Sequence, residues 1–249
     1  MTALSLFSGA DGFGLAASLL GIEVLAHVEI DTVFDEHYKR HWPYAKRFYD
    51  VRTTSPGDLP STDIVFGGEP CQGNSSAGNR KGKEDDRYLW PDYFAICKAK
   101  RPTWIINENV TGSISNMVLD TKIADLESIG YSCRAFNLPA VAVGAFNERK
   151  RIWLVAYTDG QRSFQGTPSF KRGWTLRRTV QQEELQGEGL GTQYSRGVTG
   201  RIFPYPDERV FEMVNDVPSE LAQLKAYGNA VNPWIPFVLL SFIKQVHES

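Results

Sequence analysis

The chain is poor in the residues that build disulfide frameworks and metal sites. Its 249 residues include three cysteines and four histidines, and the cysteines (Cys71, Cys97 and Cys133) are widely spaced. They form no CxxC pair and no Cys/His cluster, so the sequence predicts neither a disulfide scaffold nor a zinc site. We therefore expect a reducing, cytoplasmic environment.

Long apolar runs and a strong net charge are also missing. No stretch of about 18 apolar residues occurs, which excludes a membrane span. The first residues lack the basic region and cleavage site of a signal peptide, so we expect no secretion. The net charge is −2, which by itself argues against a nucleic-acid partner. A local excess offsets this average, because residues 161–178 contain five Lys or Arg and no acid.

Up to about Tyr157, short β-rich runs alternate with amphipathic stretches. This alternation predicts an α/β fold with a doubly wound, mostly parallel sheet, whose ligands bind at the carboxyl ends of the strands. We expect strands at Leu4–Phe7, Val24–Ile30, Arg47–Tyr49, Ile64–Phe66, Trp104–Ile106, Tyr131–Phe136 and Ile152–Ala156. Helices are expected near residues 15–20, 32–41, 88–100, 117–129 and 234–246.

The composition changes after residue 157. Residues 158–208 are rich in Gly, Gln, Arg, Ser and Thr, carry isolated aromatics and have no clear period. This pattern predicts a small loop-rich lobe, or equally a linker. We therefore divide the chain into a main domain (1–157), an insert (158–208) and a C-terminal segment (209–249) that returns to the main domain.

Glycines and acids gather where the first strands end. The run Phe7–Gly14 follows a strand and opens a helix, where glycines let a ligand approach backbone amides. It fails as a dinucleotide fingerprint because Asp11 takes the place of the second glycine, and a plain turn capped by Asp11 is an equal alternative. Glu29 and Asp50 end the next two strands, where an acid typically holds ribose hydroxyls. Together these features indicate an adenosyl-type cofactor.

A thiol and a carboxylate follow two later strands. Cys71 stands in Pro70-Cys71-Gln72 after one apolar run, and Glu108 follows the next. A nucleophilic sulfur and an acid at one sheet edge indicate covalent catalysis assisted by an acid. Each has a simpler explanation alone, because a lone cysteine is usually a small buried hydrophobe and Glu108 equally suits a helix cap.

In this order the motifs resemble those of the cytosine-C5 DNA methyltransferases, with further likeness to phage and prophage members. The resemblance rests on Phe7–Gly14, Glu29, Asp50, Gly67–Gln72, Glu108–Val110, Asn147–Arg151 and Gly228–Val231. It covers the chain outside the insert. It implies the Rossmann-like fold of S-adenosylmethionine-dependent methyltransferases, with the insert as a small target-recognition lobe.

The resemblance implies a DNA (cytosine-5-)-methyltransferase acting on a cytosine flipped out of the duplex. The methyl group would come from S-adenosyl-L-methionine, leaving S-adenosyl-L-homocysteine, and no metal is implied. Cys71 would add to C6 of the base while Glu108 holds or protonates N3. Asn109 would fix the Glu108 carboxylate, Arg151 would contact O2 of the base, and Arg149 would orient the site.

Binding residues are implied in the same way. The cofactor would contact Phe7, Gly9, Gly12, Glu29, Ile30, Asp50, Val51, Pro70, Asn229 and Val231. Double-stranded DNA would contact Gln72, Ser75, Arg80 and Lys81 in one loop and Arg162, Lys171 and Arg172 in the insert. We expect a monomer in the cytoplasm of a bacterium or a phage-infected host, with a cognate restriction endonuclease as partner if the chain belongs to a restriction pair.

Three positions depart from the family pattern. Asp11 replaces a glycine and would lie near the cofactor's carboxylate. Glu69 stands where proline or phenylalanine is commoner, and would raise the pKa of the Cys71 thiol if it is ionised and close. Asn147 replaces a glutamine. Two alternatives stay open: the same chemistry on RNA, as in the tRNA-methylating branch, and a non-catalytic nucleic-acid-binding relative. The sequence does not specify the DNA target.

Overall fold

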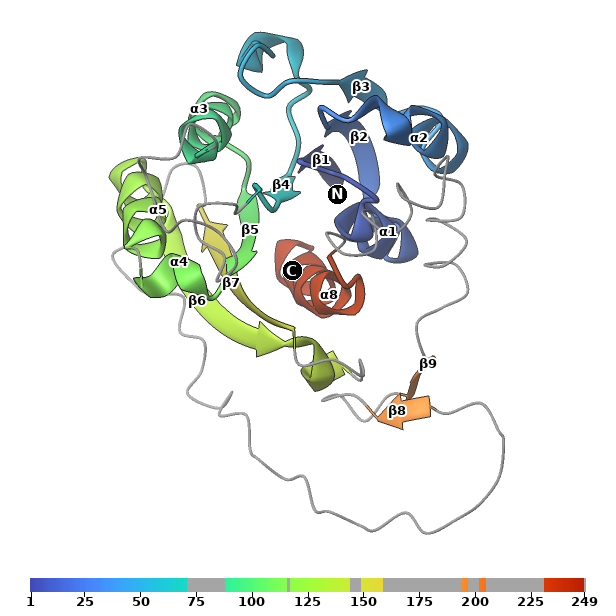
Figure 1. Ribbon diagram of the computed structural model, residues 1–249, viewed down its shortest axis with the longest axis vertical. Helices are drawn as coiled ribbons and strands as arrows, with labels where there is room; N and C mark the ends of the chain where they lie inside the picture. The colour runs from blue at the N-terminus through green and yellow to red at the C-terminus, as the bar shows by residue number, and fades with distance from the viewer. Residues whose placement is uncertain are drawn as a thin grey trace, which may run out of the picture.

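The computed structural model describes residues 1–70, 88–115, 117–143, 149–158, 194–196, 202–204 and 231–248. A seven-stranded sheet in the order β3-β2-β1-β4-β5-β7-β6 forms its centre (Figure 1). Its strands are β1 (Thr2–Leu6), β2 (Glu23–Val28), β3 (Lys46–Phe48), β4 (Ile64–Gly67), β5 (Trp104–Val110), β6 (Ser132–Pro139) and β7 (Lys150–Tyr157). Only β7 runs antiparallel to its neighbours within this sheet. The predicted mostly parallel α/β fold is confirmed.

Helices cover both faces of the sheet (Figure 1). They are α1 (Gly12–Leu19), α2 (Asp35–His41), α3 (Trp90–Lys100), α4 (Gly112–Ser115), α5 (Val118–Ser128) and α8 (Trp234–His247), with short 3-10 turns η1 (Thr32–Phe34), η2 (Pro56–Asp58) and η4 (Ala140–Val143). A separate pair of short strands, β8 (Tyr194–Arg196) and β9 (Ile202–Pro204), lies within the predicted insert. Among the described residues no helix has the length and apolarity to cross a bilayer.

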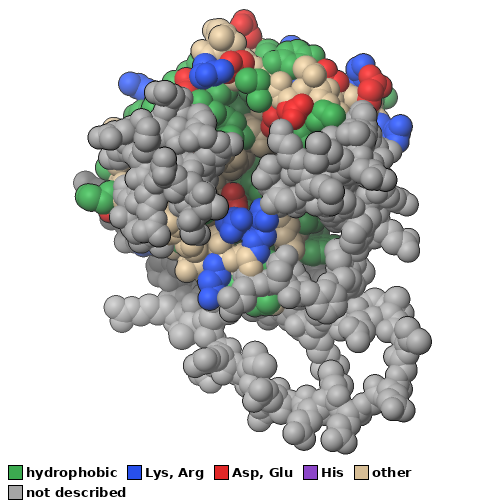
Figure 2. Space-filling model, in the orientation of Figure 1, with side chains coloured by type: hydrophobic (Ala, Val, Ile, Leu, Met, Phe, Trp, Pro, Cys, Tyr) green, Lys and Arg blue, Asp and Glu red, His purple; other side chains and the backbone are tan. Residues whose placement is uncertain are grey.

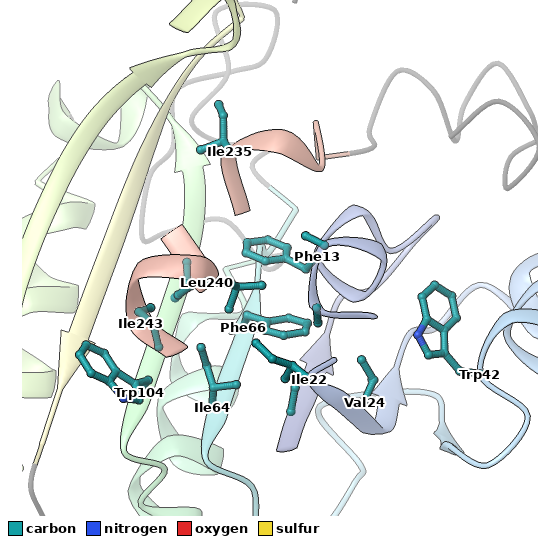
Figure 3. Close-up of a cluster of buried hydrophobic side chains, with 14 of the residues drawn as sticks. Phe13, Ile22, Val24, Trp42, Ile64, Phe66, Trp104, Ile235, Leu240 and Ile243 are labelled. Atoms are coloured by element: carbon teal, nitrogen blue, oxygen red, sulfur yellow. The ribbon is translucent and has the colours of Figure 1, made fainter. Parts of the chain in front are cut away.

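Two hydrophobic clusters lie on opposite faces of the sheet, because successive strand residues point to opposite sides. Ile64 and Phe66 of β4 belong to the cluster beneath α1 and α8, which Figure 3 shows in close-up. Val65, between them, belongs to the cluster beneath α3 and α5. Both faces of the strand are therefore buried, as the continuous apolar run of a central parallel strand predicts.

The C-terminal helix α8 closes the first of these clusters. Ile235, Leu240 and Ile243 are buried, and they pack with Phe13 of α1 and Phe66 of β4 (Figure 3). Apolar residues at this spacing form one face of a helix. The expected helix at residues 234–246 therefore lies on the main sheet, and Val231, just before it, lies beside Gly12 at the start of α1.

Strand β5 is longer than the sequence predicts. The apolar run ends at Ile106, but the strand continues to Val110 because each of its residues pairs with β7, from Trp104 opposite Tyr157 to Val110 opposite Arg151. Asn107, Glu108 and Asn109 are thus on a buried strand and not in the loop after it. This extension sets the direction of the polar side chains that form the candidate site.

Candidate functional site

The exits of β1 and β2 are joined at the carboxyl edge of the sheet. Phe7 and Gly9 both have positive φ, 53° and 52°, so the chain turns sharply as soon as β1 ends. The Phe7 amide donates a hydrogen bond to the carbonyl of Val28 at 2.7 Å. Glu29 accepts from the Gly9 amide through one carboxylate oxygen at 2.8 Å, and from the Asp31 amide through the other at 3.0 Å. The predicted cofactor residues of the first two turns are therefore in contact.

Asp11 points into the protein. Its carboxylate accepts hydrogen bonds from the Gly14 amide at 2.8 Å and the Ser5 hydroxyl at 3.0 Å, and its other oxygen lies 3.1 Å from His27 Nδ1. The residue is 2% exposed and caps α1 in a left-handed conformation, φ 53°, which Asp tolerates better than most residues. The capping alternative is confirmed. The Asp11 side chain points to the start of α1 and to His27, and the expected nearness of this acid to the cofactor's carboxylate stays a prediction.

The surface beside Glu29 is suited to an adenosine. Ile30, the next residue, is 61% exposed although it is a large apolar side chain. A carboxylate beside an open apolar side chain provides an acceptor for ribose hydroxyls and a contact for a base. Apart from its two chain neighbours, no atom of the described residues lies within 4 Å of the position that a Gly9 Cβ would take. The described residues therefore leave room for a ligand over the turn.

Asp50 and Val51 follow β3 at the same edge. The Asp50 carboxylate pairs with Arg52 at 2.6 Å, and the hydrogen bond from Arg52 holds the pKa of Asp50 below its usual value. The acid is therefore ionised at neutral pH. The Val51 side chain is buried in the cluster beneath α3 and α5, so a ligand contact by this residue would use its backbone.

Val231 returns to the first turn. A Cβ built on Gly12 would lie 2.1 Å from the Val231 carbonyl oxygen, a distance that no real Cβ contact reaches. The glycine is required because the C-terminal segment crosses directly over the start of α1. The structure thus brings together two predicted cofactor residues that are far apart in the sequence.

We expect Gly12→Ala to lower the free energy of unfolding by about 1–3 kcal/mol, because the new methyl group must displace the backbone at Val231. Urea unfolding checks this. Gly57→Ala is the matched control, since its Cβ would come no closer than 3.4 Å to Ser55 Oγ at an exposed site, and it should leave stability unchanged or slightly raised. Equal unfolding midpoints for the two variants would contradict the close approach.

Glu108 is a buried acid on β5. It is 9% exposed, and Arg151 Nε lies 3.0 Å from its Oε1. Burial raises the pKa of Glu108, while Arg151 and then Arg149 oppose the rise. A Cβ on Gly68 would lie 2.7 Å from Glu108 Oε2, so the chain leaving β4 passes directly over this carboxyl. The predicted group of Glu108, Arg149 and Arg151 is brought together, with the ion pair to Arg151.

The other two polar residues of β5 face the opposite side of the sheet. Asn107 donates to one carboxylate oxygen of Glu69 at 2.7 Å and Asn109 donates to the other at 2.8 Å. Lys122 of α5 forms an ion pair with the same carboxylate. The Asn109 amide thus contacts Glu69, and its expected role in fixing the Glu108 carboxylate stays a prediction.

Sequence reasoning missed Lys122. The buried side chains of α5 are Val118, Lys122 and Leu126, which are spaced by four residues and so lie on one face of the helix. The lysine stands between two apolar residues of that stripe, and this position could have predicted a buried ion pair, because a buried lysine requires an anionic partner. Glu69 is that partner.

Several predicted residues lie outside the described part of the chain. Pro70 is described and exposed. Those outside are Cys71, Gln72, Ser75, Arg80, Lys81, Asn147, Arg162, Lys171, Arg172 and Asn229. Among the described residues no three His, Cys, Asp or Glu side chains form a group that could hold a metal ion.

Comparisons with known proteins identify the family to which the chain belongs. The family of C-5 cytosine-specific DNA methylases matches residues 1–229. The type II methyltransferase M.AgeI of Thalassovita gelatinovora is 30% identical over 233 residues, which cover 88% of this chain and 54% of the relative. M.FnuDI of Fusobacterium nucleatum is 32% identical over 161 residues, or 63% and 47% of the two chains. The chain spans about half the length of these relatives.

A solved structure has the same fold. DNMT2 of Spodoptera frugiperda, in a mutant form, superimposes with a TM-score of 0.55 at 25% identity, covering 69% of this chain and 52% of that one. The family match covers residues 1–229, a range that includes the glycine turn, Glu29, Glu108 and Arg151. The chain belongs to the family of C-5 cytosine-specific DNA methylases.

Proposed function

We propose that the protein is a DNA (cytosine-5-)-methyltransferase that acts on a flipped-out cytosine of double-stranded DNA through a covalent intermediate on Cys71. The observation that carries this is the Glu108 carboxyl. It is buried, its pKa is raised, Arg151 holds it, and Gly68, three residues before Cys71, packs against it. A carboxyl in that state suits a general acid.

The chemistry follows from these groups. The Cys71 thiolate forms a bond to C6 of the base, and Glu108 gives its proton to N3, so negative charge does not build up on the ring. C5 then becomes nucleophilic. S-adenosyl-L-methionine, when bound, would supply the methyl group that C5 takes up, with S-adenosyl-L-homocysteine as the product. The C5 proton passes to water as the C5–C6 double bond re-forms and the bond between sulfur and C6 breaks, which frees the thiolate. N3 then returns its proton to Glu108. In this scheme Arg151 contacts O2 of the base and also orients the Glu108 carboxyl, with which it forms an ion pair. Arg149 orients the site and adds positive charge beside Glu108.

The cofactor would lie along the first three strand ends. Glu29 would accept from the ribose hydroxyls and Ile30 would cover the adenine. Asp50 would accept from a polar hydrogen of the nucleoside. The methionine end would lie over Phe7, Gly9 and Gly12, where Pro70, Asn229 and Val231 complete the pocket. Support comes from the open space over Gly9 and the packing of Gly12 on Val231.

DNA would contact basic residues around this edge. Lys and Arg side chains gather near the centre of the face in Figure 2, beside an acidic side chain, and such a face suits phosphates. We propose that Ser75, Arg80 and Lys81 of one loop contact the backbone with Gln72. Residues 158–208, with Arg162, Lys171 and Arg172, would form the target-recognition part, inserted between residues 1–157 and 209–249.

The partners would be duplex DNA and, in a restriction pair, a cognate endonuclease. The enzyme would be a monomer.

Incubation with labelled S-adenosyl-L-methionine tests the substrate class. Duplex DNA and tRNA are offered separately. We expect label on DNA, as 5-methylcytosine after hydrolysis, because the chain belongs to the C-5 cytosine-specific DNA methylases. Label on tRNA alone would eliminate the DNA methyltransferase in favour of the RNA alternative, and label on neither substrate would support a non-catalytic relative.

A further inference from the structure

A fully buried polar cluster joins three elements on the side of the sheet opposite Glu108. Glu69, just past β4, holds Lys122 of α5 in an ion pair and accepts from Asn107 and Asn109 of β5 at 2.7 and 2.8 Å. Lys122 Nζ also donates to Asn107 Oδ1 at 2.7 Å. Each carboxylate oxygen therefore has a donor, and the lysine has two acceptors.

Stability alone does not account for this cluster. The side chains of Lys122 and Glu69 are 1% and 4% exposed, and removing two charges from water costs free energy that their attraction repays only with good geometry. Apolar side chains of similar volume typically serve a core equally well. A hydrogen-bonded ion pair differs from apolar packing because each bond fixes the relative positions of two particular atoms, and so of the segments that carry them.

In the sequence, the cluster lies next to the two residues to which the proposed function gives the chemistry, Cys71 and Glu108. Glu69 is two residues before Cys71 in the sequence, and Asn107 and Asn109 flank Glu108 on β5. Because side chains alternate along a strand, the Asn107 and Asn109 amides bind Glu69 on one face of the sheet, while Glu108 points to the other face. Lys122 anchors the cluster to α5, with its ammonium 5.1 Å from the centre of the Trp90 ring.

We propose that the Lys122–Glu69 ion pair is a positioning device for methyl transfer, which fixes the backbone leading from β4 to Cys71 relative to Glu108 on β5. This inference rests on the proposed function. Neither residue touches the reacting base. They act through the residues beside them, by holding the nucleophile and the acid at one separation.

The Lys122–Glu69 pair also affects the pKa of Glu108 through two opposite charges. The charged groups that act on this acid are Arg151 and Arg149 from β7, Glu69 after β4, and Lys122 from α5. Glu69 raises the pKa of Glu108 and Lys122 lowers it. Together they leave a neutral pair, so removing the acid alone leaves a positive charge that favours ionised Glu108.

Three variants test the proposal: Glu69→Gln, Lys122→Met and the double variant. A misplacement of about 1 Å can reduce a rate by about 100-fold, so we expect each to lower kcat by roughly 10–100-fold while KM for S-adenosyl-L-methionine stays within about twofold of wild type. The alkaline limb of the pH–kcat profile should move to lower pH in Glu69→Gln and return to the wild-type position in the double variant.

The exposed pair of Glu36 and Lys39, with side chains 70% and 71% exposed, provides the control, and Glu36→Gln/Lys39→Met should keep the wild-type kcat and pH profile. If the single variants fail to fold, the double variant decides, because it buries no unpaired charge. A folded double variant with wild-type kcat would overturn the proposal. So would single variants whose activity falls only with their folded fraction. Absence of methyl transfer in the wild type would instead refute the proposed function.

Discussion

Replacing Cys71 by serine is expected to lower methyl transfer to DNA by roughly 10⁴–10⁶-fold, the range seen when an essential nucleophile is removed. The thiolate is the attacking form of cysteine, and a serine hydroxyl of nearly the same size does not ionise at neutral pH. The fold and cofactor binding should be unchanged. Transfer of label from S-adenosyl-L-methionine to duplex DNA measures the loss.

Cys133 is the matched control, because it is the less buried of the two described cysteines and packs in the core on β6. Burial raises the pKa of Cys133 to about 12, and burial also raises the pKa of Cys97. Neither is a thiolate at neutral pH. Cys133→Ala should therefore keep wild-type activity. Retained activity in Cys71→Ser, or its loss in Cys133→Ala alone, would show that the nucleophile has been misassigned.

Glu108→Gln is expected to lower kcat by about 10²–10⁴-fold, the usual contribution of a general acid. The amide keeps the volume of the buried carboxyl but has no proton to give to N3. Binding of S-adenosyl-L-methionine, followed by calorimetry, should be unchanged, since Glu108 lies outside the proposed cofactor contacts. Glu23→Gln, at an exposed position of β2, is the control.

The pH dependence of Glu108→Gln gives a second readout. Burial raises the pKa of Glu108, so the acid keeps its proton to a higher pH than an ordinary glutamic acid. The wild-type rate should fall as pH rises through this raised pKa, because only the protonated form can donate. The variant should lack that alkaline limb. A variant that loses activity yet keeps the limb would exclude Glu108 as the titrating group.

The centre of the sheet was predictable because strands such as β4 are buried on both faces. Val65 and Phe66 are buried in the clusters on the two faces of the sheet. A continuous apolar run of this kind predicts a central parallel strand from its own residues alone. The end of β5 was not predictable in the same way. Asn107 and Asn109 resemble a loop in sequence, and they are in a strand because β7 pairs with them and Glu69 satisfies their amides.

The site was predicted in part. The family resemblance implied that Val231 returns to the cofactor turn and that Arg151 belongs to the same site as Glu108, and the structure shows Gly12 against Val231 and Glu108 paired with Arg151. The direction of Asp11 does not, because a capping carboxylate and one that faces a ligand have the same sequence pattern. It is decided by the buried partners of the carboxylate, which are the Ser5 hydroxyl and the Gly14 amide that donate to it and His27 of β2 beside it. Partners supplied by tertiary structure are what the motif pattern leaves out.

The most direct test of the covalent route uses duplex DNA in which 5-fluorocytosine replaces cytosine throughout, so the target sequence need not be known. Fluorine at C5 cannot leave as a proton, and the bond between sulfur and C6 should persist after methyl transfer. We expect a stable protein–DNA adduct that depends on S-adenosyl-L-methionine and maps by peptide mass to Cys71. Turnover on this DNA without an adduct, or an adduct at another residue, would contradict the mechanism.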